Sequence, residues 1–202
     1  MKKKLPIYEL VINETTPESG VDYVAMVDDP AILERGMWMM FDKQKEFAFK
    51  GDVEKRIVSG FLMVADMPIY RRDEAKGEYY VVFTKETIEK IVKKFAKNNF
   101  HNNVNVMHDK ELKVPGVYMI EIFTIDKARG INTPKGFDTA PDGSLYASYY
   151  VENEDFWNMF IKTGKLQGFS VEGMFAYDYE ESTTKEMKAL RQILKDFIDG
   201  IE

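Results

Sequence analysis

The sequence predicts an α+β fold, in which mostly antiparallel strands form a sheet or a small barrel and helices flank it. Two observations support this class. Roughly six to nine strand-like runs and three helix-like stripes occur in mixed order along the chain. The 202 residues are 45% hydrophobic and 31% charged, so the chain is long and apolar enough to bury a substantial core.

The first 50 residues are expected to be extended. The turn formers of residues 13–20 separate two apolar runs, and Asp28, Asp29 and Pro30 end the second run. The strands expected in this part of the chain are 7–12, 22–27, 38–41 and 47–49.

The middle of the chain is expected to hold several strands around one amphipathic helix. Thr84 is a favourable N-cap, and apolar side chains recur at helical spacing from Ile88 to Phe95. The charged residues around Arg71 favour a solvated loop. The expected elements are strands at 57–65, 79–83, 104–108 and 114–124, a polar loop at 67–77 and a helix at 85–98.

The last third of the chain is expected to combine two strands, 145–151 and 168–179, with two helices. Asn153 is a favourable N-cap for a short helix that ends at Gly164. Apolar residues at helical spacing in 183–202 predict an amphipathic C-terminal helix. We therefore expect one domain over residues 1–180, followed by the helix at 183–202.

Composition excludes several classes of chemistry. The absence of cysteine excludes disulfides, a thiol nucleophile and thiolate metal sites, and two histidines cannot form a three-histidine zinc centre. The 34 Asp and Glu residues outnumber the 28 Lys and Arg residues, which argues against a nucleic-acid surface. No apolar run approaches the roughly 18–20 residues of a membrane span. We expect no metal, no cofactor, no nucleic-acid partner and no membrane association.

A catalytic site in this chain must be built from oxygen nucleophiles, carboxylates and the two histidines. Ser170, on a predicted strand with glycines nearby, is the most suggestive of six serines, because glycines let a substrate backbone approach. Glu172 lies two residues later and so shares its face, and His108 ends a predicted strand. The pattern is not a complete G-x-S-x-G elbow. Composition and spacing alone also fit purely structural roles for Ser170 and His108, so the function stays open at this point.

The sequence resembles the prohead (capsid maturation) proteases of tailed phages, in particular the XkdF-like branch. The resemblance is carried by residues 58–98, by Asn103–Asp109 and by Gly164–Gly173 in this order and spacing. It implies a serine endopeptidase with the herpesvirus-assemblin type of fold, a small β-barrel with surrounding helices. In that family a His on one strand and a Ser on a later strand form the core of the site, which here are His108 as general base and Ser170 as nucleophile.

The third catalytic group is open among Glu172, Asp22, Asp109 and His101. In the family, a Val-x-x-Pro-Ala motif follows the serine strand, whereas the similar Val27–Ala31 lies near the N-terminus of this chain. The resemblance therefore implies a circular permutation of the strand at 22–31. It places the third group at about Tyr23, which is not an acid, and leaves Asp22 and Glu172 as the nearest substitutes.

The resemblance implies processing of scaffold and major capsid protein inside an assembling prohead in the host cytoplasm, with self-cleavage. The helix at 183–202 would dock on scaffold or on another copy of the protease. Docking on another copy would form a homo-oligomer. A different class of function is a catalytically inactive head component with a protease fold that binds scaffold. A third reading is a phage domain that shares only the fold.

Overall fold

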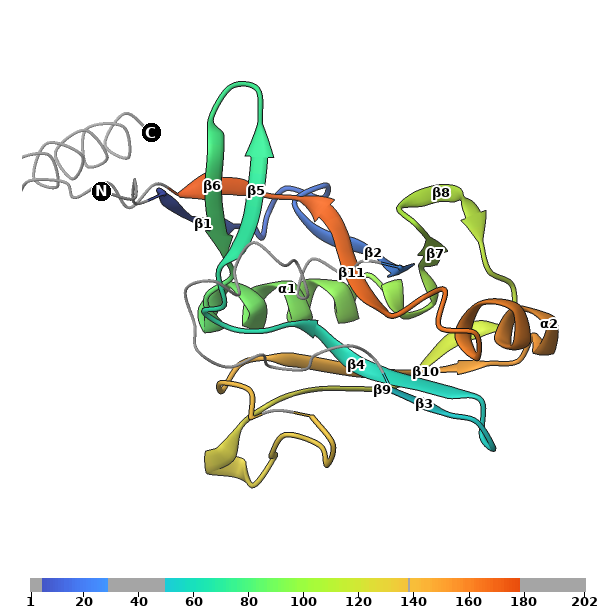
Figure 1. Cartoon of the computed structure of the whole chain (residues 1–202). Coiled ribbons are helices and arrows are strands. Elements are labelled where there is room, and N and C mark those ends of the chain that lie inside the picture. The colour runs from blue at the N-terminus through green and yellow to red at the C-terminus, as the bar shows by residue number, and fades with distance from the viewer. Residues whose placement is uncertain (1–4, 29–49, 138, 179–202) are drawn as a thin grey trace, which may run out of the picture.

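The computed structural model describes residues 5–28, 50–137 and 139–178. These residues form an α+β arrangement of three four-stranded sheets around one long helix (Figure 1). The expected strands at 38–41 and 47–49 and the expected helix at 183–202 lie outside the described residues. Within the described part of the chain, the strands do not close into a barrel, so the expectation of a small barrel is wrong there.

The three sheets are rich in antiparallel pairs, as predicted. Sheet C is fully antiparallel, whereas sheets A and B each contain one parallel pair, β1 with β6 and β2 with β7. Sheet A has the order β12 (Ala176–Asp178), β1 (Ile7–Val11), β6 (Gly77–Val82), β5 (Ile69–Asp73). Sheet B has the order β11 (Gly168–Met174), β2 (Gly20–Val27), β7 (Val104–Val106), β8 (Asp109–Lys113). Sheet C has the order β3 (Lys50–Asp52), β4 (Ile57–Met63), β10 (Leu145–Val151), β9 (Val117–Thr124).

The long helix α1 (Lys85–Lys97) lies between sheets B and C in Figure 1. Thr84 caps it as predicted, because its hydroxyl accepts a hydrogen bond from the backbone N–H of Thr87. The buried stripe of Ile88, Ile91 and Phe95 joins side chains from all three sheets in one hydrophobic core. The other helical segments are short: η3 (Phe100–Asn102), η4 (Lys127–Arg129), α2 (Glu154–Phe156) and the π-helical η5 (Trp157–Ile161).

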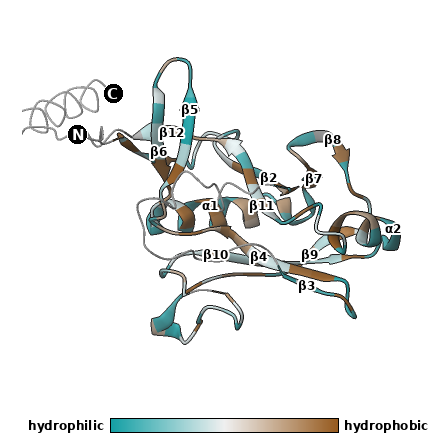
Figure 2. Ribbon diagram, in the orientation of Figure 1, coloured by the Kyte–Doolittle hydropathy of each residue, from teal (hydrophilic) through white to brown (hydrophobic). Residues whose placement is uncertain are grey.

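The segment expected to be a polar loop at 67–77 is largely a strand. β5 pairs with β6 as a hairpin, whose exposed end is hydrophilic in Figure 2. Cross-strand hydrogen bonds satisfy two carboxylates of this hairpin. The Tyr79 hydroxyl donates to Asp73 at 2.7 Å, and the Tyr70 hydroxyl donates to Glu78 at 2.6 Å. The charge of the segment suggested a loop, but these pairs let a charged sequence form an edge strand.

Two further boundaries differ from the prediction. The expected strand at 104–108 ends at Val106, and the chain then turns directly into β8, which the sequence had not indicated. The expected strand at 168–179 divides into β11 and β12 at Phe175, so the same stretch serves sheets B and A in succession. Both differences place chain reversals and bends beside the candidate catalytic residues.

Candidate active site

Sheet B brings His108, Glu172 and Asn105 into contact. One carboxylate oxygen of Glu172, Oε1, lies 3.3 Å from Nδ1 of His108 and accepts a hydrogen bond of 2.6 Å from Nδ2 of Asn105. The Glu172 side chain is only 13% exposed, and Asn105 is fully buried. A shielded carboxylate held by a buried amide therefore faces the imidazole, whose side chain is 46% exposed.

The strand register places Ser170 on the same face as this cluster. Ser170 is opposite Ala25 of β2, and Ala25 is opposite Asn105 of β7. Directly paired residues project from the same side of a sheet, and so do residues two apart on a strand. Ser170, Asn105 and Glu172 consequently share one face of sheet B, with only the small side chain of Ala25 between the serine and the asparagine.

His108 lies in a tight turn rather than at a strand end. Met107 and His108 have φ values of 54° and 61°, and the flanking residues Val106 and Asp109 are paired. Two positive φ values between paired strands define a type I′ turn, which usually takes Asn and Gly. The expectation of a strand through 108 is wrong because the alternating Val-Asn-Val-Met-His sequence has no turn former. The reversal allows the imidazole to reach Glu172.

This turn stores conformational strain. A residue other than glycine in the left-handed region costs about 1–2 kcal/mol, and here two such residues are consecutive. Strain of this kind persists only where the surrounding structure fixes it, and it concentrates at functional sites.

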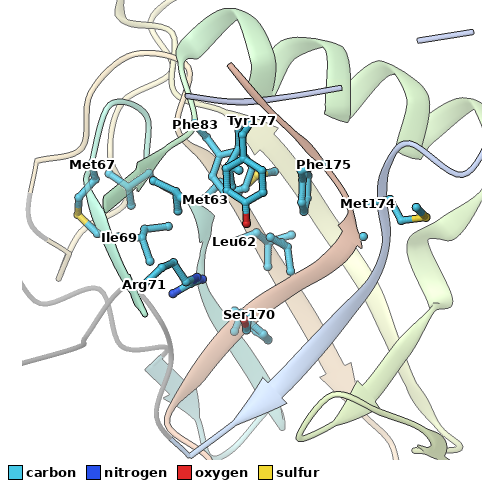
Figure 3. Close-up of a pocket in the computed structure, with 16 residues that line it drawn as sticks. Leu62, Met63, Met67, Ile69, Arg71, Phe83, Ser170, Met174, Phe175 and Tyr177 are labelled. Atoms are coloured by element: carbon cyan, nitrogen blue, oxygen red, sulfur yellow. The ribbon is translucent and has the colours of Figure 1, made fainter. Parts of the chain in front are cut away.

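Ser170 borders a cavity of about 350 Å³. Figure 3 shows the serine together with Leu62 and Arg71 around this space. The serine is half-buried, and among the described residues no group forms a hydrogen bond with its hydroxyl. Ser170 is therefore a lining residue of a space that a ligand can enter, and its hydroxyl is not engaged by another described residue.

The other three candidates for the third catalytic group lie elsewhere. Asp22 shares the face of β2 that carries the core residue Val24, opposite to the face of Ala25. The carboxylate of Asp109 accepts a hydrogen bond from the backbone N–H of Glu111 at the start of β8. His101 lies in η3 with its ring 5.6 Å from that of Phe95. Of the four candidates, Glu172 is the one in contact with His108.

The sequence suggested that glycines near Ser170 let a substrate backbone approach, but Gly173 is required for a different contact. A Cβ atom at this position would lie 1.8 Å from the carbonyl oxygen of Gly20. The glycine thus allows β2, rather than a substrate, to approach β11. The register between the two strands shifts between Glu172 and Gly173, and such a bulge re-aims the neighbouring side chains.

Sequence reasoning missed two residues of this region. Asn105 is a polar residue between two valines on a short strand, which is the signal that could have singled it out. Arg71 was assigned to a solvated loop, yet it lies on β5 and lines the cavity beside Ser170. Among the described residues, no cluster of three or more His, Asp or Glu side chains could hold a metal ion, and no helix is long and apolar enough to cross a membrane.

Comparison with known proteins identifies the family. Residues 44–180 match the family model described as "Putative phage serine protease XkdF". The match covers more than half of the chain and includes β11, β7 and the turn that carries His108. No curated protein and no solved structure matches the chain significantly. The chain belongs to the XkdF family of phage serine proteases.

Proposed function

We propose that the protein is a serine endopeptidase in which Ser170 is the nucleophile, His108 the general base and Glu172 the acid that orients the histidine. The observation that carries this proposal is the 3.3 Å contact between His108 Nδ1 and Glu172 Oε1 on the sheet face that also holds Ser170. In a Ser-His-acid triad the acid lies at one imidazole nitrogen and the serine at the other.

The contact assigns a role to each nitrogen of His108. A carboxylate at Nδ1 holds the proton on that nitrogen, which leaves the lone pair of Nε2 available to the Ser170 hydroxyl. The serine oxygen then bonds to the scissile carbonyl carbon as its proton passes to Nε2. His108 returns that proton to the leaving amine when the peptide C–N bond breaks. Water hydrolyses the resulting acyl-enzyme by the same route in reverse.

The register supports Glu172 as the substitute for the tyrosine at the family's third position. Tyr23, at about the position where the resemblance places the third group, is the cross-strand partner of Glu172. The acid is supplied at the same level of the sheet but from the neighbouring strand. Because β2 lies between β7 and β11, the proposed circular permutation puts the N-terminal strand between the histidine and serine elements, in an assemblin-type arrangement.

The proposed substrates are the phage scaffold protein and the major capsid protein, with self-cleavage, inside the assembling prohead. Membership in a phage serine protease family supports this assignment. On this proposal the protease acts while it is enclosed with its substrates, and copies of the chain meet one another there.

A second candidate is a head component that keeps the fold without cleaving. The observation that favours it is the lack of a hydrogen bond between Ser170 and His108 in the described part of the chain. Catalytic hydrogen bonds in enzymes without substrate are often long and tighten only in the complex. The triad geometry therefore favours the enzyme over this candidate, and one experiment separates them.

The test is coexpression of the full chain with its scaffold and capsid proteins, followed by intact-mass spectrometry. Wild type should release defined fragments, and Ser170→Ala should leave both proteins intact. Ser19→Ala is the matched control, because the Ser19 hydroxyl only accepts a hydrogen bond from the backbone N–H of Asn13 in an N-terminal turn. This variant should cleave both substrates like wild type. Intact substrates with folded wild-type protein in assembled heads would establish the non-cleaving head component.

A further inference from the structure

We propose that the cavity beside Ser170 is a specificity pocket that takes a large apolar side chain such as Leu, Met or Phe. We further propose that Arg71 pairs with an acidic residue of the same substrate strand. This inference rests on the proposed function, since it names the class of peptide that the serine site cleaves.

The walls of the cavity are apolar and come from all three sheets and the segments beside them. Leu62 and Met63 on β4 are buried, and so are Ile69 on β5 and Phe83 after β6. The hydroxyl of Tyr177 points into the space in Figure 3. The volume of about 350 Å³ lies at the small end of ligand pockets, which suits one large side chain rather than a cofactor.

Arg71 is the only charged side chain among the described residues that line this cavity. It is half-buried, and its Nη1 donates to the backbone carbonyl of Tyr70 at 2.9 Å. Within the described residues no carboxylate forms an ion pair with it. A guanidinium has five donors in a planar fork that matches a carboxylate, so its remaining donors favour an acidic group of the ligand.

The strands around the cavity set the spacing of the two recognised side chains. In the described part of the chain, β5 ends sheet A and β11 ends sheet B, and residues of both strands line the cavity. An extended peptide can hydrogen-bond to such strand edges. Side chains two residues apart on an extended peptide project to the same side. We therefore expect the acidic residue two positions from the apolar one.

The experiment uses a fully randomised decapeptide library, with cleavage sites read by mass spectrometry for wild type, Arg71→Glu and Arg72→Glu. Wild type should favour Leu, Met or Phe at one position beside the cut and Asp or Glu two residues from it. Arg71→Glu should replace the acidic preference by Lys or Arg, changing the acidic-to-basic ratio by about tenfold or more. Arg72→Glu is the matched control, because Arg72 is exposed on the other face of β5 and should leave selectivity unchanged.

The outcomes separate this inference from the proposed function. Cleavage that needs Ser170 but falls equally for all peptides in Arg71→Glu would show that Arg71 does not read charge, and the inference would be wrong. If no peptide is cleaved, capture of the library on immobilised Ser170→Ala decides the inference by binding alone. Captured peptides enriched in the same apolar and acidic residues would support the inference if the double variant with Arg71→Glu keeps the apolar enrichment and loses the acidic one. Capture without this enrichment would overturn it.

Discussion

Glu172→Gln tests the triad because it keeps the shape of the side chain and removes its charge. The imidazolium that forms when Ser170 attacks lies 3.3 Å from the carboxylate oxygen. At an effective dielectric constant of about 20, this attraction is about 5 kcal/mol. His108 is nearly half exposed, so solvent reduces the loss to roughly 3 kcal/mol, which corresponds to a fall of about a hundredfold in kcat.

The glutamine amide of the Glu172→Gln variant also changes the preferred tautomer of His108. The single oxygen of this amide still accepts the hydrogen bond from Asn105, and its NH₂ group then faces Nδ1 of His108. This arrangement favours the proton on Nε2, where the lone pair is needed, and adds to the loss in kcat. KM should change little, because the interaction is made mainly in the transition state.

The assay is cleavage of a quenched fluorescent peptide taken from a mapped processing site, with Asp109→Asn as the matched control. Asp109 directly follows His108, but its carboxylate bonds to the backbone of Glu111 within β8, so this variant should keep a kcat within about twofold of wild type. If Glu172→Gln retains wild-type kcat while folded, the assignment of Glu172 as the orienting acid is refuted. A loss of kcat in both variants would instead indicate that the β7–β8 hairpin is damaged.

Three further predictions concern the stability of the elements around the site and are measured by urea unfolding. Gly173→Ala should destabilise the fold by about 3 kcal/mol, because its Cβ meets the backbone of Gly20; an unchanged midpoint would contradict the close approach. Met107→Asn should stabilise the protein by about 1 kcal/mol, since asparagine tolerates a left-handed turn, and a loss would show that the side chain matters more than the strain. Lys76→Met should cost about 0.5–1 kcal/mol by removing the ammonium group that lies 3.4 Å from the ring centroid of Tyr177, whereas no effect would exclude a useful cation–π contact.

Elements with strong local signals could be predicted from the sequence. α1 has a capping threonine and a clear apolar stripe, and the structure confirms both. The strand at 145–151 is confirmed with its expected bounds, because a continuous run of β-forming residues fills a buried central strand. In each case the pattern that predicts the element lies within a few neighbouring residues of the sequence, even though β10 pairs with the distant strands β4 and β9.

The site could be predicted only in part, because its geometry depends on long-range pairing. Ser170 and Glu172 are expected on one face from their spacing alone, and the continuous register with β2 agrees. The contact of Glu172 with His108 depends on a turn without a turn former and on a strand from the N-terminus between them. Local propensity carries no information on either feature. The position of Arg71 beside Ser170 was missed for the same reason, since β5 and β11 belong to different sheets and are far apart in the sequence.

The strained turn and the small residue Ala25 answer the same geometric requirement. The strands of His108 and Ser170 are not neighbours, so two strand spacings, about 10 Å, separate their backbones. Ala25, fully buried between Ser170 and Asn105 in the register, occupies little of the space above β2 because its side chain is small. The left-handed turn sends the imidazole back across that space to Glu172. A histidine on a regular continuation of β7 would instead follow the strand past this level of the sheet. The cost of two residues with positive φ is therefore offset by the contact that the turn creates between the imidazole and Glu172.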